Sequence, residues 1–106
     1  MSNDFLPLAK PDITEEEVDA VVDVVRSGWW TTGPKVVEFE NALSDYLGKN
    51  EKIHVVGLNS CTSALFLSLV ALGIKHGDEV IVPTWTFAAT AQVVEWVGAK
   101  VILCHV

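Results

Sequence analysis

From residue 53 onward, short apolar segments alternate with segments of helix length, and this alternation constrains the fold more than any other feature. Residues 53–56, 79–82 and 101–103 have the length and composition of buried strands. We expect one helix after the turn at 57–60, ending at Gly73, and another from near Thr86 to Gly98. Strands so far apart cannot be hairpin partners, so the pattern β-α-β-α-β predicts an α/β fold with a parallel sheet.

The first of these two helices is apolar most of the way round. Its hydrophobic residues do not keep to one face, which is typical of a helix surrounded by protein. We therefore expect this helix to be deeply buried. The residues concerned are Ala64, Leu65, Leu67, Leu69, Val70 and Leu72.

Two further helices are expected in residues 1–52. Thr14 followed by Glu17 forms a capping box, and Gly28 provides the left-handed stop. Pro34 suits the first turn of the next helix, which Gly48 closes. The segment between them, Trp29-Trp30-Thr31-Thr32-Gly33, is too short for an element and unusually aromatic for a linker.

Charge and length exclude several classes of protein. Fourteen acidic residues against seven basic ones give a net charge of −7, so no basic patch exists for nucleic acid. The scattered cysteines and histidines show no zinc-ligand spacing. No secretory signal and no apolar run of about 20 residues are present, so we expect a cytoplasmic protein without a membrane span.

The candidate site residues follow two strands, where ligands gather in parallel α/β folds. The first group is Asn59-Ser60-Cys61-Thr62-Ser63, where amides and hydroxyls at a helix start suit a phosphate monoester. Its alternative is that Ser60 or Asn59 is only a helix cap. The second group is Trp85-Thr86-Phe87, whose rings could lie against a flat ligand or plug the strand end into the core.

Four blocks of sequence, taken together, resemble one family. They are Ser-Gly-Trp-Trp-Thr-Thr-Gly-Pro at 27–34, Asn-Ser-Cys-Thr-Ser-Ala-Leu at 59–65, Ala-Leu-Gly-Ile-Lys-His-Gly-Asp-Glu-Val-Ile-Val-Pro at 71–83 and Thr-Trp-Thr-Phe-Ala-Ala-Thr at 84–90. In order and spacing they are similar to the DegT/DnrJ/EryC1/StrS family of fold-type I, pyridoxal-phosphate-dependent sugar aminotransferases. The resemblance implies that residues 1–106 are the N-terminal part of the cofactor-binding large domain, with 1–52 helical and 53–106 β-α-β-α-β.

The resemblance also implies roles for individual residues. Ser60, Cys61 and Thr62 fall where the family holds the phosphate of pyridoxal 5′-phosphate, and Phe87 falls where a ring stacks on the pyridine. Thr31, Thr32 and Gly33 fall at the substrate entrance, although a plain helix connector anchored by two tryptophans explains that loop equally well. The implied substrates are a nucleotide-linked keto-sugar and an amino-acid donor, typically glutamate.

The resemblance leaves the activity of this chain open. The family's Schiff-base lysine and its acid lie beyond residue 106, and none of the six lysines here matches, so we expect the chain alone to be inactive. The family's dehydratase branch and a non-catalytic phosphate-binding or assembly module remain alternatives, while a dinucleotide-binding domain fits poorly. In the family's sheet order, residues 53–56 have no neighbour among these strands, so we expect an incomplete sheet and a homo-oligomer, as a dimer.

Overall fold

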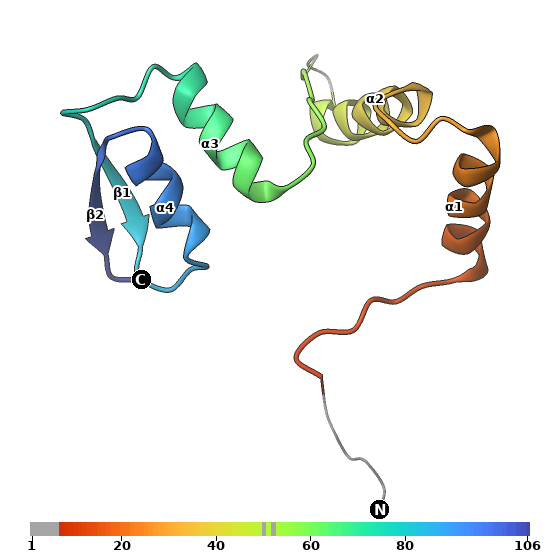
Figure 1. Ribbon diagram of the computed structural model, residues 1–106, viewed down its shortest axis with the longest axis horizontal. Helices are drawn as coiled ribbons and strands as arrows, with labels where there is room; N and C mark the ends of the chain where they lie inside the picture. The colour runs from red at the N-terminus through yellow and green to blue at the C-terminus, as the bar shows by residue number, and fades with distance from the viewer. Residues whose placement is uncertain (1–6, 50, 52) are drawn as a thin grey trace, which may run out of the picture. The chain divides into compact units, whose positions relative to one another are not determined.

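The computed structural model describes residues 7–49, 51 and 53–106, in two compact units that divide between Val55 and Val56. The predicted α/β class is confirmed: a helical first unit is followed by a second unit of helices and a parallel sheet. Figure 1 labels the elements in chain order. They are α1 (Glu15–Ser27), α2 (Pro34–Gly48), α3 (Cys61–Ala71), β1 (Glu79–Pro83), α4 (Ala89–Trp96) and β2 (Lys100–Cys104).

Helix α1 begins and ends where its sequence predicts. The backbone N–H of Thr14 donates to Oε2 of Glu17 at 2.7 Å, and the hydroxyl of Thr14 donates to the same oxygen. Gly28 adopts φ 73°, a left-handed conformation that favours glycine, and its N–H donates to the carbonyl of Val25 at 3.3 Å. No residue of α1 is buried, so local capping rather than tertiary packing defines its ends.

The cap makes the start of α1 dependent on pH. Hydrogen bonds from the hydroxyl and then the backbone N–H of Thr14 hold the pKa of Glu17 below its ordinary value. A lowered carboxyl pKa stabilises the fold above the ordinary pKa of glutamate, and this contribution is lost as the pH falls through the lowered value. We expect the amide resonance of Thr14 to report fraying of α1 over that acidic range. The variant Glu17→Gln should lack this titration, whereas an unchanged titration would contradict the role of Glu17.

Helix α2 also keeps its predicted bounds. Pro34 occupies the first turn, and the amides of Val36 and Val37 donate to the carbonyl of Gly33 at 3.0 and 3.2 Å. At the other end Gly48 is the buried residue of the helix, and the hydroxyl of Ser44 donates to the carbonyl of Ile53. The chain therefore folds back along the last turns of α2.

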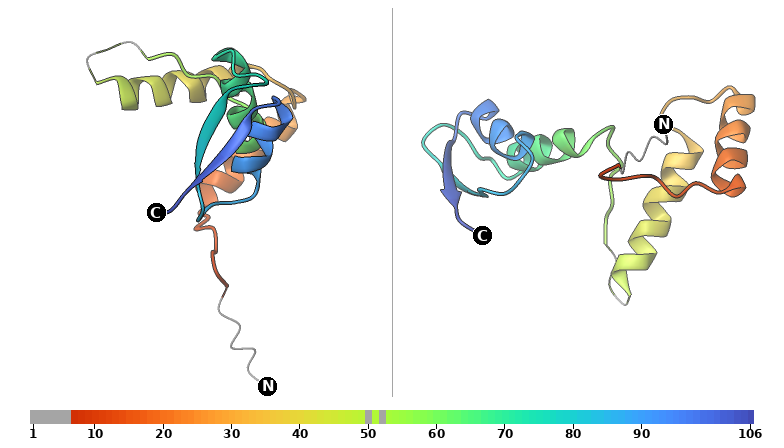
Figure 2. Two further views of the ribbon diagram at one scale, coloured as in Figure 1. Left: turned by 90° about the vertical axis from the view of Figure 1, so that its left-hand side faces the viewer. Right: turned by 90° about the horizontal axis from the view of Figure 1, so that it is seen from below.

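In the second unit, β1 and β2 pair in parallel over five residue pairs, from Glu79 with Lys100 to Pro83 with Cys104. The amide of Thr84 extends the ladder by donating to the carbonyl of Cys104 at 2.9 Å. Helix α4 connects the two strands and packs over one face of the pair (Figure 2). This arrangement is one complete β-α-β unit, as the alternation of the sequence predicts.

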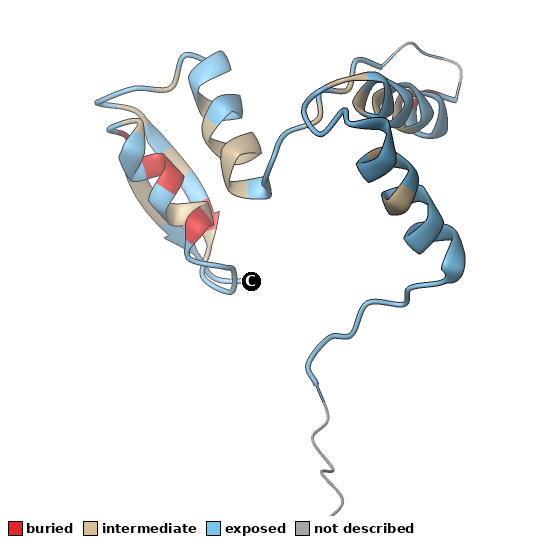
Figure 3. Cartoon of the chain, turned by 45° about the vertical axis from the view of Figure 1, so that its right-hand side comes forward, coloured by how far each residue is buried: buried red, intermediate tan, exposed pale blue. Residues whose placement is uncertain are grey.

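The core of the second unit lies between α4 and the strands. Val82, Val94 and Ala99 are buried together, and Ala89 and Val93 add two more buried side chains from α4. Figure 3 shows most of the buried residues gathered around this helix. The core is small, so each of its side chains carries a large share of the unit's stability.

Three expectations about the second half are wrong. Residues 53–56 form no strand, because β1 and β2 pair only with each other and no other described strand offers 53–56 a hydrogen-bonded neighbour. Helix α3 is not deeply buried. Among the described helices only α4 packs on it, with Phe66 meeting Trp96 edge to face at 6.1 Å, and Leu67, Val70 and Leu72 stay exposed.

The third correction concerns the start of α4. It begins at Ala89, three residues after the predicted Thr86. Thr84 still belongs to the sheet ladder, so the chain needs residues 85–88 to turn from the strand into the helix. The hydroxyls of Thr86 and Thr90 bond across this turn at 2.9 Å. The sequence-predicted start therefore falls inside the loop that carries the second group of candidate site residues.

Candidate functional site

The start of α3 is fixed by three polar side chains. The hydroxyl of Ser60 accepts from the backbone N–H of Ser63 at 3.1 Å, which makes Ser60 the N-cap of the helix. The hydroxyl of Ser63 donates to Oδ1 of Asn59 at 2.7 Å and lies 2.9 Å from the hydroxyl of Ser60. Ser60 therefore acts as a helix cap in this structure, which is the alternative given above for this residue.

These bonds account for the hydroxyl protons. Ser63 has one hydroxyl proton and gives it to Asn59, so Ser60 supplies the proton of the bond between the two serines. Ser60 thus uses its hydroxyl as both donor and acceptor within the cap. A ligand role for Ser60 stays a prediction, and its hydroxyl, like that of Ser63, is engaged within the cap.

Two backbone amides at the helix start remain without an acceptor among the described residues. They belong to Cys61 and Thr62, the first two residues of α3, whereas the amides of Ser63 and Ala64 both bond to Ser60. Cys61 is exposed and Thr62 is half-buried. Free N–H groups at a helix start carry partial positive charge and attract anions, so these two amides and the hydroxyl of Thr62 could hold a phosphate.

The second group of candidate residues lies on the loop between β1 and α4. Trp85 is 90% exposed and Phe87 is 81% exposed. The alternative that these rings plug the strand end into the core is therefore wrong. Their exposure leaves both rings free to contact a ligand. That role for Phe87 stays a prediction.

The two groups lie at the same end of the second unit. Figure 1 shows α3 and β1 running in opposite directions, so the start of α3 and the end of β1 face the same way. Both groups are open to solvent. At this end, a ligand that carries a phosphate and a flat ring would find hydrogen-bond donors for its phosphate and apolar surface for its ring.

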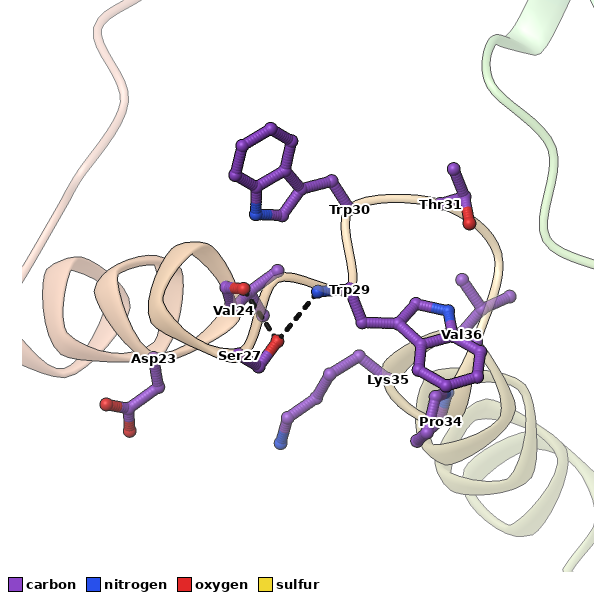
Figure 4. Close-up of a pocket in the computed structure, with 10 residues that line it drawn as sticks. Asp23, Val24, Ser27, Trp29, Trp30, Thr31, Pro34, Lys35 and Val36 are labelled. Carbon is purple, nitrogen blue, oxygen red and sulfur yellow. Dashed lines mark hydrogen bonds between the residues drawn. The ribbon is translucent and has the colours of Figure 1, made fainter.

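The third candidate region is the loop between α1 and α2, shown in Figure 4. The indole N–H of Trp29 donates to the carbonyl of Thr32, and that of Trp30 donates to the carbonyl of Val25, both at 3.0 Å. The Trp29 ring lies so close to Gly33 that an added Cβ would stand 2.1 Å from its Nε1. Only glycine fits at position 33 with the ring in this place.

This loop borders a pocket of about 420 Å³ within the first unit. Thr31 and Gly33 line it, whereas Thr32 contributes its carbonyl to Trp29 instead of lining the pocket, and a substrate role for the three residues stays a prediction. The alternative that this loop is a plain helix connector anchored by two tryptophans also fits, because both indole N–H groups donate to backbone carbonyls. The full lining comprises Asp23, Val24, Ser27, Trp29, Trp30, Thr31, Gly33, Pro34, Lys35 and Val36.

Sequence reasoning missed the charged residues of this pocket. Lys35 forms an ion pair with Glu38 at 2.7 Å, and this hydrogen bond raises the pKa of the Lys35 ammonium, with a smaller contribution from Asp23. Asp23 and Lys35 belong to the helix turns on either side of the loop.

Other kinds of site find little support in the part of the chain that the structure describes. Within residues 7–49, 51 and 53–106, no three His, Cys, Asp or Glu side chains are grouped to hold a metal ion. No helix in these ranges is both long and apolar enough to span a bilayer. Each described lysine is exposed to solvent, so none of them lies in a closed site that would favour a neutral amine.

Comparison with known proteins gives consistent matches. The sequence model of the DegT/DnrJ/EryC1/StrS aminotransferase family matches residues 11–106. A UDP-4-amino-4-deoxy-L-arabinose–oxoglutarate aminotransferase of Shewanella sediminis is 45% identical to this chain. The match covers 100% of this chain and 26% of that protein. A spore coat polysaccharide biosynthesis protein of Bacillus subtilis is 42% identical over 98% of this chain and 26% of its own length.

A solved structure agrees in fold. A protein of Streptococcus pneumoniae, described as a sugar aminotransferase and solved in its PLP form, superposes with a TM-score of 0.81 at 46% identity. The superposition covers 92% of this chain and 24% of that protein. The chain thus spans about a quarter of the length of the relatives it matches.

Proposed function

The chain belongs to the DegT/DnrJ/EryC1/StrS aminotransferase family, and on this premise we propose that it forms the phosphate-holding part of a pyridoxal 5′-phosphate site in a sugar aminotransferase. One observation carries the proposal: the amides of Cys61 and Thr62 have no acceptor among the described residues. The exposed ring of Phe87, on the loop that follows β1, would add a surface for the pyridine.

The residues of this chain would bind and orient the cofactor. The two amides and the hydroxyl of Thr62 would donate to a dianionic phosphate, and charge-assisted hydrogen bonds of this kind are about twice as strong as neutral ones. Phe87 would hold the ring flat and exclude water from one of its faces. When bound, the cofactor supplies the electron sink that allows an amino group to pass between two carbon skeletons.

The substrates and partners follow from the family. We propose a nucleotide-linked keto-sugar as the acceptor and an amino acid, typically glutamate, as the donor, in agreement with the nucleotide sugar named for the Shewanella relative. We also propose a homodimer in the cytoplasm. The described lysines are all exposed, and we propose that this chain contributes binding rather than the covalent step, which needs a lysine.

The proposal is tested with pyridoxamine 5′-phosphate, which has no aldehyde and cannot attach to surface lysines. Equilibrium dialysis of the 106-residue chain, followed by the fluorescence of the pyridoxamine ring, measures its binding. We expect pyridoxamine without the phosphate to bind at least tenfold more weakly. Equal binding of the two compounds would refute a phosphate site.

A variant of Thr62 localises the binding. Thr62→Val keeps the shape of the side chain and removes its hydroxyl, so we expect about a tenfold loss of affinity for pyridoxamine 5′-phosphate, equivalent to about 1.4 kcal/mol. Thr62→Ser restores the hydroxyl and should restore the affinity. An unchanged affinity in Thr62→Val would place the phosphate elsewhere.

A further inference from the structure

The hydroxyl of Ser60 directly precedes the two residues, Cys61 and Thr62, whose amides have no acceptor among the described residues. A serine hydroxyl has one proton and two lone pairs. The amide of Ser63 donates to one lone pair at 3.1 Å, and the proton goes to the Ser63 hydroxyl at 2.9 Å. The Ser60 hydroxyl therefore keeps only an acceptor position, and it cannot donate to a phosphate oxygen while its proton stays on Ser63.

The direction of this bond is set by Asn59. The Ser63 hydroxyl gives its single proton to Oδ1 of Asn59 at 2.7 Å, so its oxygen acts only as an acceptor and takes the proton of Ser60. Ser63 is half-buried, whereas Asn59 and Ser60 are exposed. The three side chains thus form hydrogen bonds that run in one direction, from Ser60 to Ser63 and from Ser63 to Asn59.

We propose that Ser63 is a positioning residue that prevents the Ser60 hydroxyl from donating to the cofactor phosphate, an inference that rests on the proposed function. The phosphate then meets the amides of Cys61 and Thr62 and the Thr62 hydroxyl as donors, but not the hydroxyl of Ser60. Ser63 acts on the phosphate through Ser60. The same hydrogen bonds that stabilise the first turn of α3 therefore limit the affinity of the phosphate site.

The inference predicts tighter binding after a side chain is truncated, a result that a purely structural role of Ser63 would not give. Ser63→Ala removes the acceptor of the Ser60 proton but keeps the backbone N–H that the cap requires. The Ser60 hydroxyl can then donate to the phosphate, and one additional hydrogen bond corresponds to about two- to tenfold higher affinity for pyridoxamine 5′-phosphate. Ser63→Thr keeps a hydroxyl at this position and should bind as the unchanged chain does.

A second variant releases the same proton by a different route. In Asn59→Ala the Ser63 hydroxyl loses its acceptor and can donate to Ser60, which reverses the bond between the two serines. We expect this variant also to bind about two- to tenfold more tightly. Adding Ser60→Ala to either variant removes the released hydroxyl, so the gain should disappear. A gain of the same size with and without the Ser60 hydroxyl would overturn the proposal.

The affinities are measured on the 106-residue chain from the amide resonances of Cys61 and Thr62, with pyridoxamine 5′-phosphate and inorganic phosphate as separate probes. Circular dichroism shows whether each variant keeps the helix content of the unchanged chain. Asn59→Ala leaves both serine hydroxyls in place, so it decides the question if Ser63→Ala loses helix content. Unchanged or lower affinity in the folded variants would show that Ser63 does not control the Ser60 proton.

The results separate this inference from the proposed function. If pyridoxamine 5′-phosphate binds to the unchanged chain and neither variant gains affinity, the role of Ser63 is wrong and the proposed function stands. If the variants gain affinity for inorganic phosphate, but pyridoxamine and its phosphate bind equally to the unchanged chain, the role of Ser63 stands and the cofactor site is wrong. If neither probe binds to any of the chains, both are wrong.

Discussion

Replacing Cys61 with proline is expected to lower the affinity for pyridoxamine 5′-phosphate by about ten- to a hundredfold while leaving α3 folded. Proline has no backbone N–H, so this change deletes one of the two amides proposed to hold the phosphate. It does so at the first position of the helix, where proline is favoured and no intrahelical bond is lost. A charge-assisted hydrogen bond of about 1.5–3 kcal/mol gives the expected range.

Cys61→Ala is the matched control for this prediction. It removes the thiol and keeps the amide, so its affinity should equal that of the unchanged chain. The backbone of Ser60, at φ −161° and ψ 156°, already has the extended conformation that a following proline requires. Circular dichroism should therefore show equal helix content in both variants. A Cys61→Pro chain that is folded and binds normally would eliminate this amide as a phosphate donor.

The largest effect on stability is expected from Val82→Asp. Val82 is 2% exposed and packs with Val94 and Ala99 at the centre of the second unit. A carboxylate at this position would be buried without a partner, which costs about 4 kcal/mol or more. Whole domains are stable by only about 5–15 kcal/mol, so we expect the second unit to unfold. Loss of the near-ultraviolet circular dichroism signal of Trp96, which packs against Phe66, measures this.

The neighbouring residue on the strand provides the control. Ile81 is 73% exposed on the opposite face of β1, so the carboxylate of Ile81→Asp stays in water. We expect that variant to keep the fold, with a change in the free energy of unfolding of about 0.5 kcal/mol. If both variants unfolded equally, the face of β1 that carries Val82 would not be the core of the unit.

The elements governed by short-range signals could be predicted from the sequence. The bounds of α1 follow from Thr14, Glu17 and Gly28, whose hydrogen bonds reach no further than one helical turn. Pro34 and Gly48 mark α2 in the same way, and Ser60 marks the start of α3. Caps and turns are local, so the residues that form them identify them directly.

Features that depend on distant parts of the chain could not be predicted in this way. Residues 53–56 have strand composition, but a strand exists only where another strand accepts its hydrogen bonds. The apolar surface of α3 predicts burial only if something covers it, and among the described elements α4 covers one side. The composition of a segment shows which secondary structure and burial it can adopt, whereas the elements packed around it decide whether it adopts them.

The candidate site likewise has a part that could be predicted from local sequence and a part that could not. The amides of Cys61 and Thr62 follow from the helix start, and hence from the local sequence. The exposure of Trp85 and Phe87 does not, because it depends on how the loop after β1 leaves the sheet. Asp23 and Lys35 reach the Trp29-Trp30 pocket from two different helices, and only the geometry of the connecting loop brings them there.

The side-chain bonds among Asn59, Ser60 and Ser63 bear on how fast an anion can be captured. They fix the first turn of α3 through interactions that are complete without any ligand. No loop has to close before the two amides can be reached, so encounter with a phosphate should proceed at a diffusion-controlled rate, with ionic strength as its main modulator. Selectivity among phosphate compounds then depends on their dissociation rates. Contacts with the aromatic loop after β1 would set these rates.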